Sequence, residues 1–390
     1  MKWLNYRSLL LVVVALAALV YSQFSIWKQP LKGDRVNWEY MSQVIARGGV
    51  PYRDAVNIKS PLSAYIGAAA IVIARPLGLR DTYAVRLVSV LMAILTVGVL
   101  FLVVFEYFQS LRAAFLAALI FMSFNAFATT NSSGIQPKTP MILFGLVGMW
   151  AIKRDLPYVA GVSGMLSALS WQPGLLFLGA AGLAFSRYLT SWRDLKVLKL
   201  IAGAAAPLAV LLGYFWAVGA LRDFYLWCFH FNYSVYGPET MRTFRAFLGY
   251  LRRIYTQYHV GENIFFYIAA FGFFATLFWE AMLAIKQGAR SLLDRAPFHA
   301  MLIVPVAYIL FCRINAQGMA DSLPFLPFVA AFASLAIVTA LDLVISLPGR
   351  VKPLPHLSAI GAAAFVVVCA VIFGKYVADA FSYNRAGNPL

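Results

Sequence analysis

Residues 33–62 read GDRVNWEYMSQVIARGGVPYRDAVNIKSPL, and this polar stretch lies between two long apolar segments. It carries three carboxylates and four cations in a chain that is 62% hydrophobic and only 12% charged. Soluble globular proteins carry about 25% charged residues. Continuous apolar runs recur along the chain, close to the roughly 20 residues that a spanning helix needs. The sequence therefore predicts an all-α fold, a polytopic bundle of transmembrane helices.

The distribution of cations predicts the topology. The first apolar run is expected to be a retained helix rather than a cleaved signal peptide. Segment 60–77 is at the lower limit of length for a span. If it does not cross and the N-terminus is cytoplasmic, every short cytoplasmic connection is basic, which satisfies the positive-inside rule with about eleven spans. Residues 28–85 then form a first outer loop in which 60–77 is re-entrant or lies on the surface. Residues 221–261 form a second long outer loop within one membrane domain, 1–390.

Apolar segments recur from end to end, and all but 60–77 are counted as spans. They lie near 8–27, 60–77, 86–105, 113–130, 139–152, 156–171, 173–187, 198–220, 262–285, 299–312, 323–347 and 357–378.

The polar stretch itself shows helical spacing. This pattern predicts an amphipathic helix at the membrane interface. Gly48 and Gly49 are expected to end it, and Pro51 prevents its continuation. The two predicted faces are an apolar one with Val36, Tyr40, Met41, Val44 and Ile45 and a solvated one with Asn37, Glu39, Gln43 and Arg47.

Asp34 sits just before the first turn of that helix, and two roles suit it. A carboxylate there can cap the helix by accepting hydrogen bonds from free backbone N–H groups. It can also act as a general base at the membrane boundary, kept ionised by the helix dipole. The two roles are compatible, because capping would fix the position of the carboxylate.

Five other charged residues are candidates for the same site. Lys59 is either a lysine that extends to the membrane surface or a phosphate contact. Arg86 opens the next span and is either an anchor or a second phosphate contact. Asp54 is expected to be a turn residue or a partner of Arg53. Asp321 begins a proline-interrupted span and is either a loop cap or a site residue.

The stretch GDRVNWEYMSQVIARGGVPYRDAVNIKSPLSAYI resembles the first outer loop of the GT-C integral membrane glycosyltransferases. It is most similar to the protein O-mannosyltransferase and lipid A aminoarabinose transferase group. The resemblance is specific over about 34–90 and general over the rest of the chain. Its matching positions are Asp34, Gly48-Gly49, Pro51-Tyr52-Arg53-Asp54, Lys59-Ser60-Pro61-Leu62 and Arg86.

The resemblance implies a polyprenyl-phosphate-linked sugar donor and a reaction on the non-cytoplasmic face. Asp34 would deprotonate an acceptor hydroxyl of a lipid, glycan or protein, and Lys59 and Arg86 would steady the departing lipid phosphate. Arg53, Asp54 and Asp321 are accessory candidates. The protein is expected to be a multi-pass protein of a bacterial or archaeal plasma membrane.

Two departures from the family pattern bear on metal use. Many relatives carry Asp-Glu at the opening motif, whereas Arg35 follows Asp34 here. Relatives often have an acid in the next outer loop, but residues 130–140 read TNSSGIQPKTP and contain none. Paired carboxylates are the usual ligands of a divalent cation. A reaction without metal or other cofactor is therefore expected, unless Asp54 or Asp321 completes a site.

Two other functions fit parts of the sequence. A transporter or flippase for a lipid-linked saccharide would place polar groups at mid-membrane, often on broken helices. A non-catalytic binding subunit would share the scaffold and tolerate the missing acid. The net charge of +17 favours membrane lipids and phosphate ligands over nucleic acid, because the chain has no long soluble segment. Its three cysteines, Cys228, Cys312 and Cys369, show no metal-binding spacing.

Overall fold

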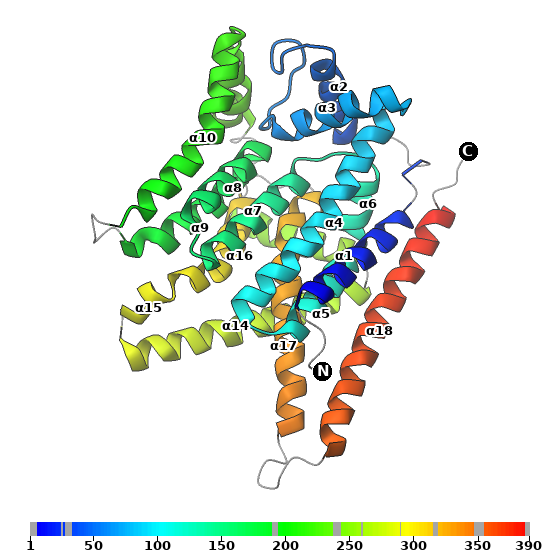
Figure 1. The fold of residues 1–390 in the computed structure, drawn as a ribbon, viewed down its shortest axis with the longest axis vertical. Helices are drawn as coiled ribbons and strands as arrows, with labels where there is room; N and C mark the ends of the chain where they lie inside the picture. The colour runs from blue at the N-terminus through cyan, green and yellow to red at the C-terminus, as the bar shows by residue number, and fades with distance from the viewer. Residues whose placement is uncertain are drawn as a thin grey trace.

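The structure is a computed structural model, and its described residues form a helical bundle (Figure 1). No strand occurs among these residues. The bundle confirms the predicted all-α fold. The structure describes residues 6–24, 26–27, 33–188, 194–236, 243–258, 260–288, 290–314, 319–346 and 355–386.

The first half of the chain supplies the polar loop helices and half of the bundle. In chain order its helices are α1 (Tyr6–Ser22), α2 (Asp34–Ala46), α3 (Leu62–Ala74), η1 (Arg75–Leu77), α4 (Asp81–Phe108), α5 (Leu111–Met122), α6 (Asn125–Ser132), α7 (Lys138–Lys153), α8 (Pro157–Ser170), η2 (Gln172–Gly174), α9 (Leu175–Phe185) and η3 (Ser186–Tyr188).

The second half contains longer helices and two π-helical turns, η4 and η5. Its helices are α10 (Lys196–Ala217), α11 (Leu221–Tyr225), η4 (Leu226–His230), η5 (Asn232–Tyr236), α13 (Phe244–Gln257), α14 (Val260–Gln287), α15 (Arg290–Asp294), α16 (Ala296–Cys312), η6 (Met319–Phe325), α17 (Leu326–Ser346) and α18 (Pro355–Ala386).

The chain is an integral, multi-pass membrane protein by the length and composition of its helices. Among the described residues, five helices are long and apolar enough to cross a membrane. The number rises to six if α5 and α6, which meet at a bend of 59°, form one broken span. The predicted count of about eleven spans, drawn from charge bias, stays a prediction.

Helices α2 and α3 pack together at one end of the bundle, beside the start of α4 and the end of α10 (Figure 1). We call this the α2 end. With 13 residues, α3 is about 20 Å long, shorter than the roughly 30 Å of hydrocarbon in a bilayer. Its length favours the prediction that segment 60–77 does not cross.

The two segments predicted to form the outer loops share a small core at the α2 end. Tyr52, from the first loop, packs edge-on against Phe224 of α11, with ring centroids 5.5 Å apart. Phe224 in turn stacks on Phe215 of α10 at 4.7 Å. All three side chains are buried. This contact holds the polar loop against the end of α10, so loop residues distant in sequence can build one site.

Helix α2 ends where two glycines allow the chain to turn back. Gly48 has a φ of +88°, a conformation that a Cβ atom disfavours. A Cβ added to Gly49 would lie 2.5 Å from a Val44 methyl carbon, so no larger side chain fits. The predicted role of these glycines in ending the helix is confirmed.

Candidate functional site

Asp34 is the first residue of α2, and its carboxylate faces Lys59. Gly33, with a φ of +61°, occupies the capping position, and no side chain makes a cap hydrogen bond there. The predicted capping role of Asp34 is therefore wrong, because the helix begins one residue earlier than expected, at Asp34 itself. Its side chain is 63% exposed, and Oδ2 lies 3.3 Å from Nζ of Lys59. An exposed pair of this kind contributes only about 0–1 kcal/mol to stability.

The main chain around Lys59 is fixed by side chains of the same loop. Tyr52 adopts a φ of +70°, and its hydroxyl donates to the Lys59 carbonyl at 2.7 Å. The Lys59 N–H donates to Oδ1 of Asn57 at 3.1 Å. The lysine is therefore held at its backbone, while its ammonium group reaches Asp34.

Two amide side chains from other segments hold the residue before Lys59. Gln172, in η2, donates to the Ile58 carbonyl at 3.2 Å and to the Cys228 carbonyl at 3.2 Å. Asn232, in η5, donates to the same two carbonyls, with 2.9 Å to that of Cys228. The π-helical turns thus contribute directly to positioning Lys59. Sequence reasoning missed both amides, since nothing local marks them.

A second ion pair, between Lys138 and Asp321, lies close to the first. Lys138 opens α7, and its Nζ is 3.0 Å from Oδ1 of Asp321 in η6; the side chains are 4% and 14% exposed. The ammonium also lies 5.0 Å from the ring centroid of Trp171. Tyr308 donates to the Asp321 carbonyl at 2.6 Å, which anchors η6 to α16. Asp321 was predicted to be either a loop cap or a site residue, and this geometry favours the site residue.

Sequence reasoning missed Lys138. The only sign of it in the sequence is a single lysine directly before an apolar run. It lies in residues 130–140, the loop that contains no acid. The ammonium of Lys138 is subject to the electrostatic field of Lys59 and Asp34 as well as that of Asp321. Four charged groups from four segments therefore act on one another. Two cations and one exposed carboxylate in one place could bind an anion and accept a proton.

Glu39 and Arg86 lie in a separate buried cluster between α2 and α4. Glu39 is 4% exposed and accepts a hydrogen bond from the hydroxyl of Thr82, so its predicted place on a solvated face is wrong. The reason is that α2 packs against α4 as well as α3. Burial raises the pKa of the Glu39 carboxyl, against the opposing influence of Thr82 and Arg86. Arg86 is 2% exposed and donates to the Ile26 carbonyl. Its role as a phosphate contact stays a prediction.

The predicted apolar face of α2 is only partly correct. Met41 is buried, but Val36 and Tyr40 are 45% and 56% exposed. Trp38, which the pattern left unassigned, is buried instead.

Asp54 and Arg53 form the turn expected of them. The N–H of Val50 donates to Oδ2 of Asp54 at 2.7 Å, and the Arg53 guanidinium lies 3.2 Å from Oδ1. These two contacts lower the pKa of the Asp54 carboxyl. Arg53 also donates to the Val218 carbonyl at 3.2 Å, which joins the loop to the end of α10. In the described part of the chain, the contacts of both residues hold the loop in its conformation.

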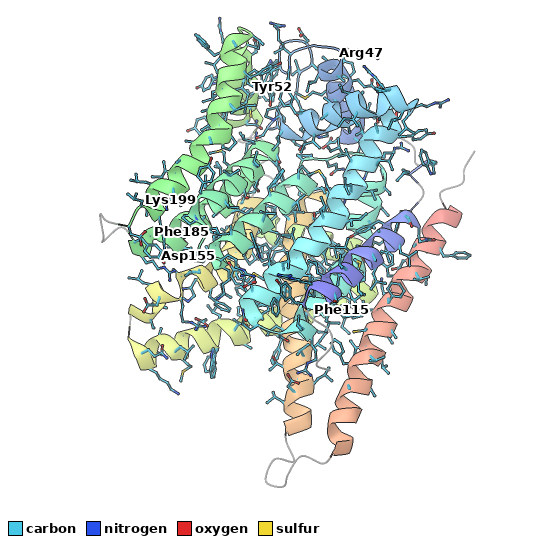
Figure 2. The ribbon with its side chains drawn as sticks, viewed as in Figure 1. Arg47, Tyr52, Phe115, Asp155, Phe185 and Lys199 are labelled. Carbon is cyan, nitrogen blue, oxygen red and sulfur yellow. The ribbon has the colours of Figure 1, made fainter. Side chains whose placement is uncertain are left out.

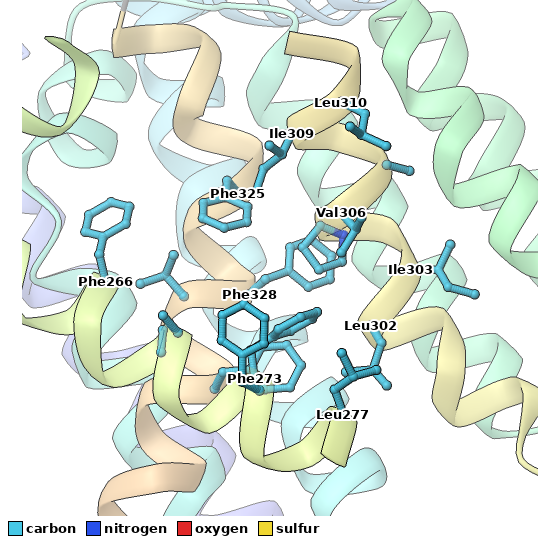
Figure 3. A pocket seen from close by; sticks show the side chains of 17 residues that line it. Phe266, Phe273, Leu277, Leu302, Ile303, Val306, Ile309, Leu310, Phe325 and Phe328 are labelled. Atoms are coloured by element: carbon cyan, nitrogen blue, oxygen red, sulfur yellow. The ribbon is translucent and has the colours of Figure 1, made fainter. Parts of the chain in front are cut away.

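An apolar cavity of about 730 Å³ lies between α14, α16 and α17. Figure 3 shows aromatic and aliphatic side chains from these helices directed toward it, among them Phe266, Val306 and Phe328. Phe325, also in its lining, belongs to η6, the same short helix that carries Asp321. The cavity and the Lys138–Asp321 pair therefore share one short helix, η6.

Metal-binding side chains do not gather at this site. In the part of the chain that the structure describes, no three His, Cys, Asp or Glu residues are placed to hold a metal ion. The two carboxylates of the candidate site, Asp34 and Asp321, are each paired with a lysine.

Comparisons with known proteins agree with this architecture. A family model described as DolP-mannose mannosyltransferase matches residues 48–212, and no curated protein sequence matches the chain. ArnT from Cupriavidus metallidurans, solved with bound undecaprenyl phosphate, is similar with a TM-score of 0.58 and 14% identity. The match covers 96% of this chain and 76% of that one.

The archaeal oligosaccharyltransferase AglB from Archaeoglobus fulgidus was solved with an inhibitory peptide and a dolichol-phosphate. It is similar with a TM-score of 0.56 and 14% identity, over 96% of this chain and 56% of AglB. The predicted resemblance to the GT-C group is confirmed at the level of the fold: this chain has the GT-C fold of membrane glycosyltransferases.

Proposed function

We propose that the chain is a glycosyltransferase that moves a sugar from a polyprenyl-phosphate donor to an acceptor hydroxyl on the non-cytoplasmic face. The observation that carries this proposal is the convergence of Asp34, Lys59, Lys138 and Asp321 at the α2 end. An exposed carboxylate beside two lysines offers one group to remove a proton and two to hold a phosphate.

Asp34 serves as the general base. It takes the proton of the acceptor hydroxyl, whose oxygen attacks the anomeric carbon as the bond from that carbon to the phosphate oxygen breaks. The lipid phosphate leaves with the electron pair, and the single displacement inverts the anomeric centre. Asp34 is exposed, so an acceptor can reach it.

The two lysines stabilise the departing phosphate. A phosphodiester carries one negative charge, and the phosphomonoester that leaves carries about −1.5 to −2 at neutral pH. Cations fixed where this charge develops lower the barrier. Lys59 exchanges its contact with Asp34 for the phosphate on donor binding, which also frees the carboxylate for catalysis. Arg86, Arg53 and Asp54 support the loop around this centre.

The apolar cavity beside η6 holds part of the polyprenyl chain. Its lining is apolar and includes Phe325 of η6, the helix that carries Asp321, so a lipid tail can lie there with its phosphate toward the lysines. The description of the matching family supports a hexose, and specifically mannose, as the sugar. The acceptor is a lipid, a glycan or a protein.

The orientation follows from charge bias. A cytoplasmic N-terminus makes the short connections at the end opposite α2 basic and places the site outside. A bacterial or archaeal plasma membrane is the setting that we propose.

A transporter for lipid-linked saccharides is the second candidate, and the bend of 59° between α5 and α6 favours it. Broken helices in transporters line sites at mid-membrane. Here the charged groups gather instead at the α2 end. Reconstitution separates the two functions: a transporter moves labelled lipid-linked sugar between leaflets without cleaving it.

The test uses purified protein and polyprenyl-phosphate mannose labelled in the sugar. Wild-type protein should release polyprenyl phosphate, and Lys59→Met or Lys138→Met should slow release by about 10²-fold or more, the effect of losing one electrostatic stabiliser. Lys199→Met, which removes an exposed lysine outside the site, is the matched control. Failure of wild-type protein to consume this donor, or its undecaprenyl and dolichyl forms, would overturn the proposal.

A further inference from the structure

A second pocket, of about 380 Å³, lies away from the α2 end, where the end of α7 meets η3 and the start of α16. Helix α7 runs from Lys138, at the site, to Lys153, in this pocket, which separates the two backbones by about 22 Å. Figure 2 shows the distance from the α2 end: Asp155, which lines the pocket, lies far from Tyr52 and Arg47. The proposed reaction makes no use of this pocket.

Three cations from three helical ends line the pocket. They are Lys153 at the end of α7, Arg187 in η3 and Arg295 at the start of α16. The ammonium of Lys153 experiences the charge of Arg295 as well as that of Glu106. The fold thus brings together three cations that are far apart in the sequence.

Lys153 is the cation available to a ligand. Within the described residues it makes no ion pair, and its Nζ lies 5.7 Å from the ring centroid of Tyr107. The carboxylate that acts on it electrostatically is Glu106, which lies 2.6 Å from the guanidinium of Arg154. Lys153 is half-buried, so its charge is incompletely solvated. An incoming anion would supply the missing partner.

The two arginines that line the pocket are held in place by contacts with neighbouring residues. Arg187 donates to the Asp294 carbonyl at 3.0 Å and to the Tyr188 hydroxyl at 2.8 Å. Arg295 makes a two-pronged ion pair with Glu280. Their side chains are therefore positioned in advance, which lowers the entropic cost of binding.

Two carboxylates also line the pocket, and their surroundings limit their effect. Asp155 is neutralised by Lys196, whose Nζ lies 2.5 Å from its Oδ2. Asp294 is exposed, where solvent screens its charge. The rings of Tyr107 and Phe298, with centroids 6.2 Å apart, supply an apolar wall.

We propose that this pocket binds a phosphate-bearing anion, with the phosphate oxygens accepting from Lys153 and Arg187 and the attached organic group against Tyr107 and Phe298. Its volume lies within the roughly 300–1,000 Å³ usual for small-molecule sites. Basic pockets between membrane helices bind phospholipid headgroups. A soluble phosphate compound offers the same chemistry, so the source of the phosphate is settled by experiment.

The experiment compares lipid and soluble phosphate on full-length protein in detergent. Native mass spectrometry measures binding of phosphatidylglycerol against phosphatidylcholine, and a thermal shift at constant ionic strength measures inorganic phosphate against chloride. Lys153→Gln should weaken the binding of the preferred probe about tenfold, the loss expected for one charge-assisted hydrogen bond. Lys153→Arg should retain it. Lys199→Gln, a change of equal charge at an exposed lysine (Figure 2), should leave it within about twofold.

The outcomes separate the sources. Preference for phosphatidylglycerol that depends on Lys153 identifies a lipid headgroup, and stabilisation by inorganic phosphate that depends on Lys153 identifies a soluble ligand. Absence of both effects in wild-type protein, or equal loss in the Lys153→Gln and Lys199→Gln variants, overturns the proposal. Arg187→Gln gives a second variant if Lys153→Gln does not fold. None of these readouts requires sugar transfer, so failure here is distinct from failure of the proposed reaction.

Discussion

Replacing Asp321 by Asn removes one partner of the buried ion pair with Lys138 and leaves an uncompensated ammonium. The side chains are 4% and 14% exposed for Lys138 and Asp321, so solvent cannot replace the lost carboxylate. Breaking a buried pair from one side costs about 3–5 kcal/mol. The ring of Trp171, 5.0 Å from the ammonium, offsets part of this loss. We therefore expect Asp321→Asn to lower the free energy of unfolding by about 3 kcal/mol.

The double variant Lys138→Met with Asp321→Asn separates stability from function. Removing both charges of a buried pair is often neutral for stability or favourable, because their desolvation cost disappears as well. The double variant should therefore recover most of the lost unfolding free energy. It should nevertheless remain defective in sugar transfer, because Lys138 is one of the two proposed phosphate contacts.

Denaturation of the purified protein by SDS in mixed micelles, followed by tryptophan fluorescence, measures both changes. Gel filtration and helical circular dichroism provide the check that each variant starts folded. The reasoning would be refuted by an Asp321→Asn variant within about 1 kcal/mol of wild type, below the range for a broken buried pair. A double variant as unstable as the single one would refute it equally.

Three further predictions address the loop, its pH dependence and metal use. Gln172→Leu removes the hydrogen bonds to the Ile58 and Cys228 carbonyls, so the KM for the lipid donor should rise about tenfold, and Gln172→Glu should not restore it, since a carboxylate cannot donate. Asp54 has a lowered pKa in the folded state, because of a backbone N–H and Arg53, so it stabilises the fold above its unfolded pKa of about 3.9. The stability difference between wild type and Asp54→Asn should be present at pH 7 and disappear as pH falls through the folded pKa, and a difference that persists at low pH would contradict this. Chelation with EDTA should leave transfer unchanged, whereas a loss reversed by Mg²⁺ or Mn²⁺ would identify a metal-dependent reaction.

The main features of the fold and three of the four charged groups of the site, all but Lys138, could be predicted from the sequence. Hydrophobic runs define bundle helices because lipid requires each backbone group to be satisfied within its own helix. Asp34 could be singled out because it lies at the start of the predicted amphipathic helix, and Lys59 because it directly precedes an apolar segment. Their contact across the loop agrees with their proposed joint action.

The rest depends on contacts between distant segments. Lys138 becomes important only because α7 begins beside η6, and a single lysine before an apolar run does not reveal that neighbour. Gln172 likewise matters because the turn between α8 and α9 lies against the Ile58 carbonyl. Periodicity also assumes one covered face, and α2 is covered by both α3 and α4. That is why Glu39 is buried although its spacing indicated a solvated position.

The capping prediction for Asp34 failed for a local reason. Gly33, with a positive φ, takes the cap position, so Asp34 falls in the first turn and its carboxylate faces Lys59. The carboxylate is thereby released from a structural role. Its exposure and its weak contribution to stability make it suited to test by substitution.

The most direct test of the central claim is the rate of sugar transfer from labelled polyprenyl-phosphate mannose by wild-type protein and Asp34→Asn. The substitution should leave the unfolding free energy within about 1 kcal/mol, because the Asp34–Lys59 pair is exposed. It should lower the transfer rate by about 10²–10⁴-fold, the usual contribution of a general base. Equal rates in the two proteins would contradict the assignment of Asp34 as the base, and no transfer by wild type would contradict the proposed function.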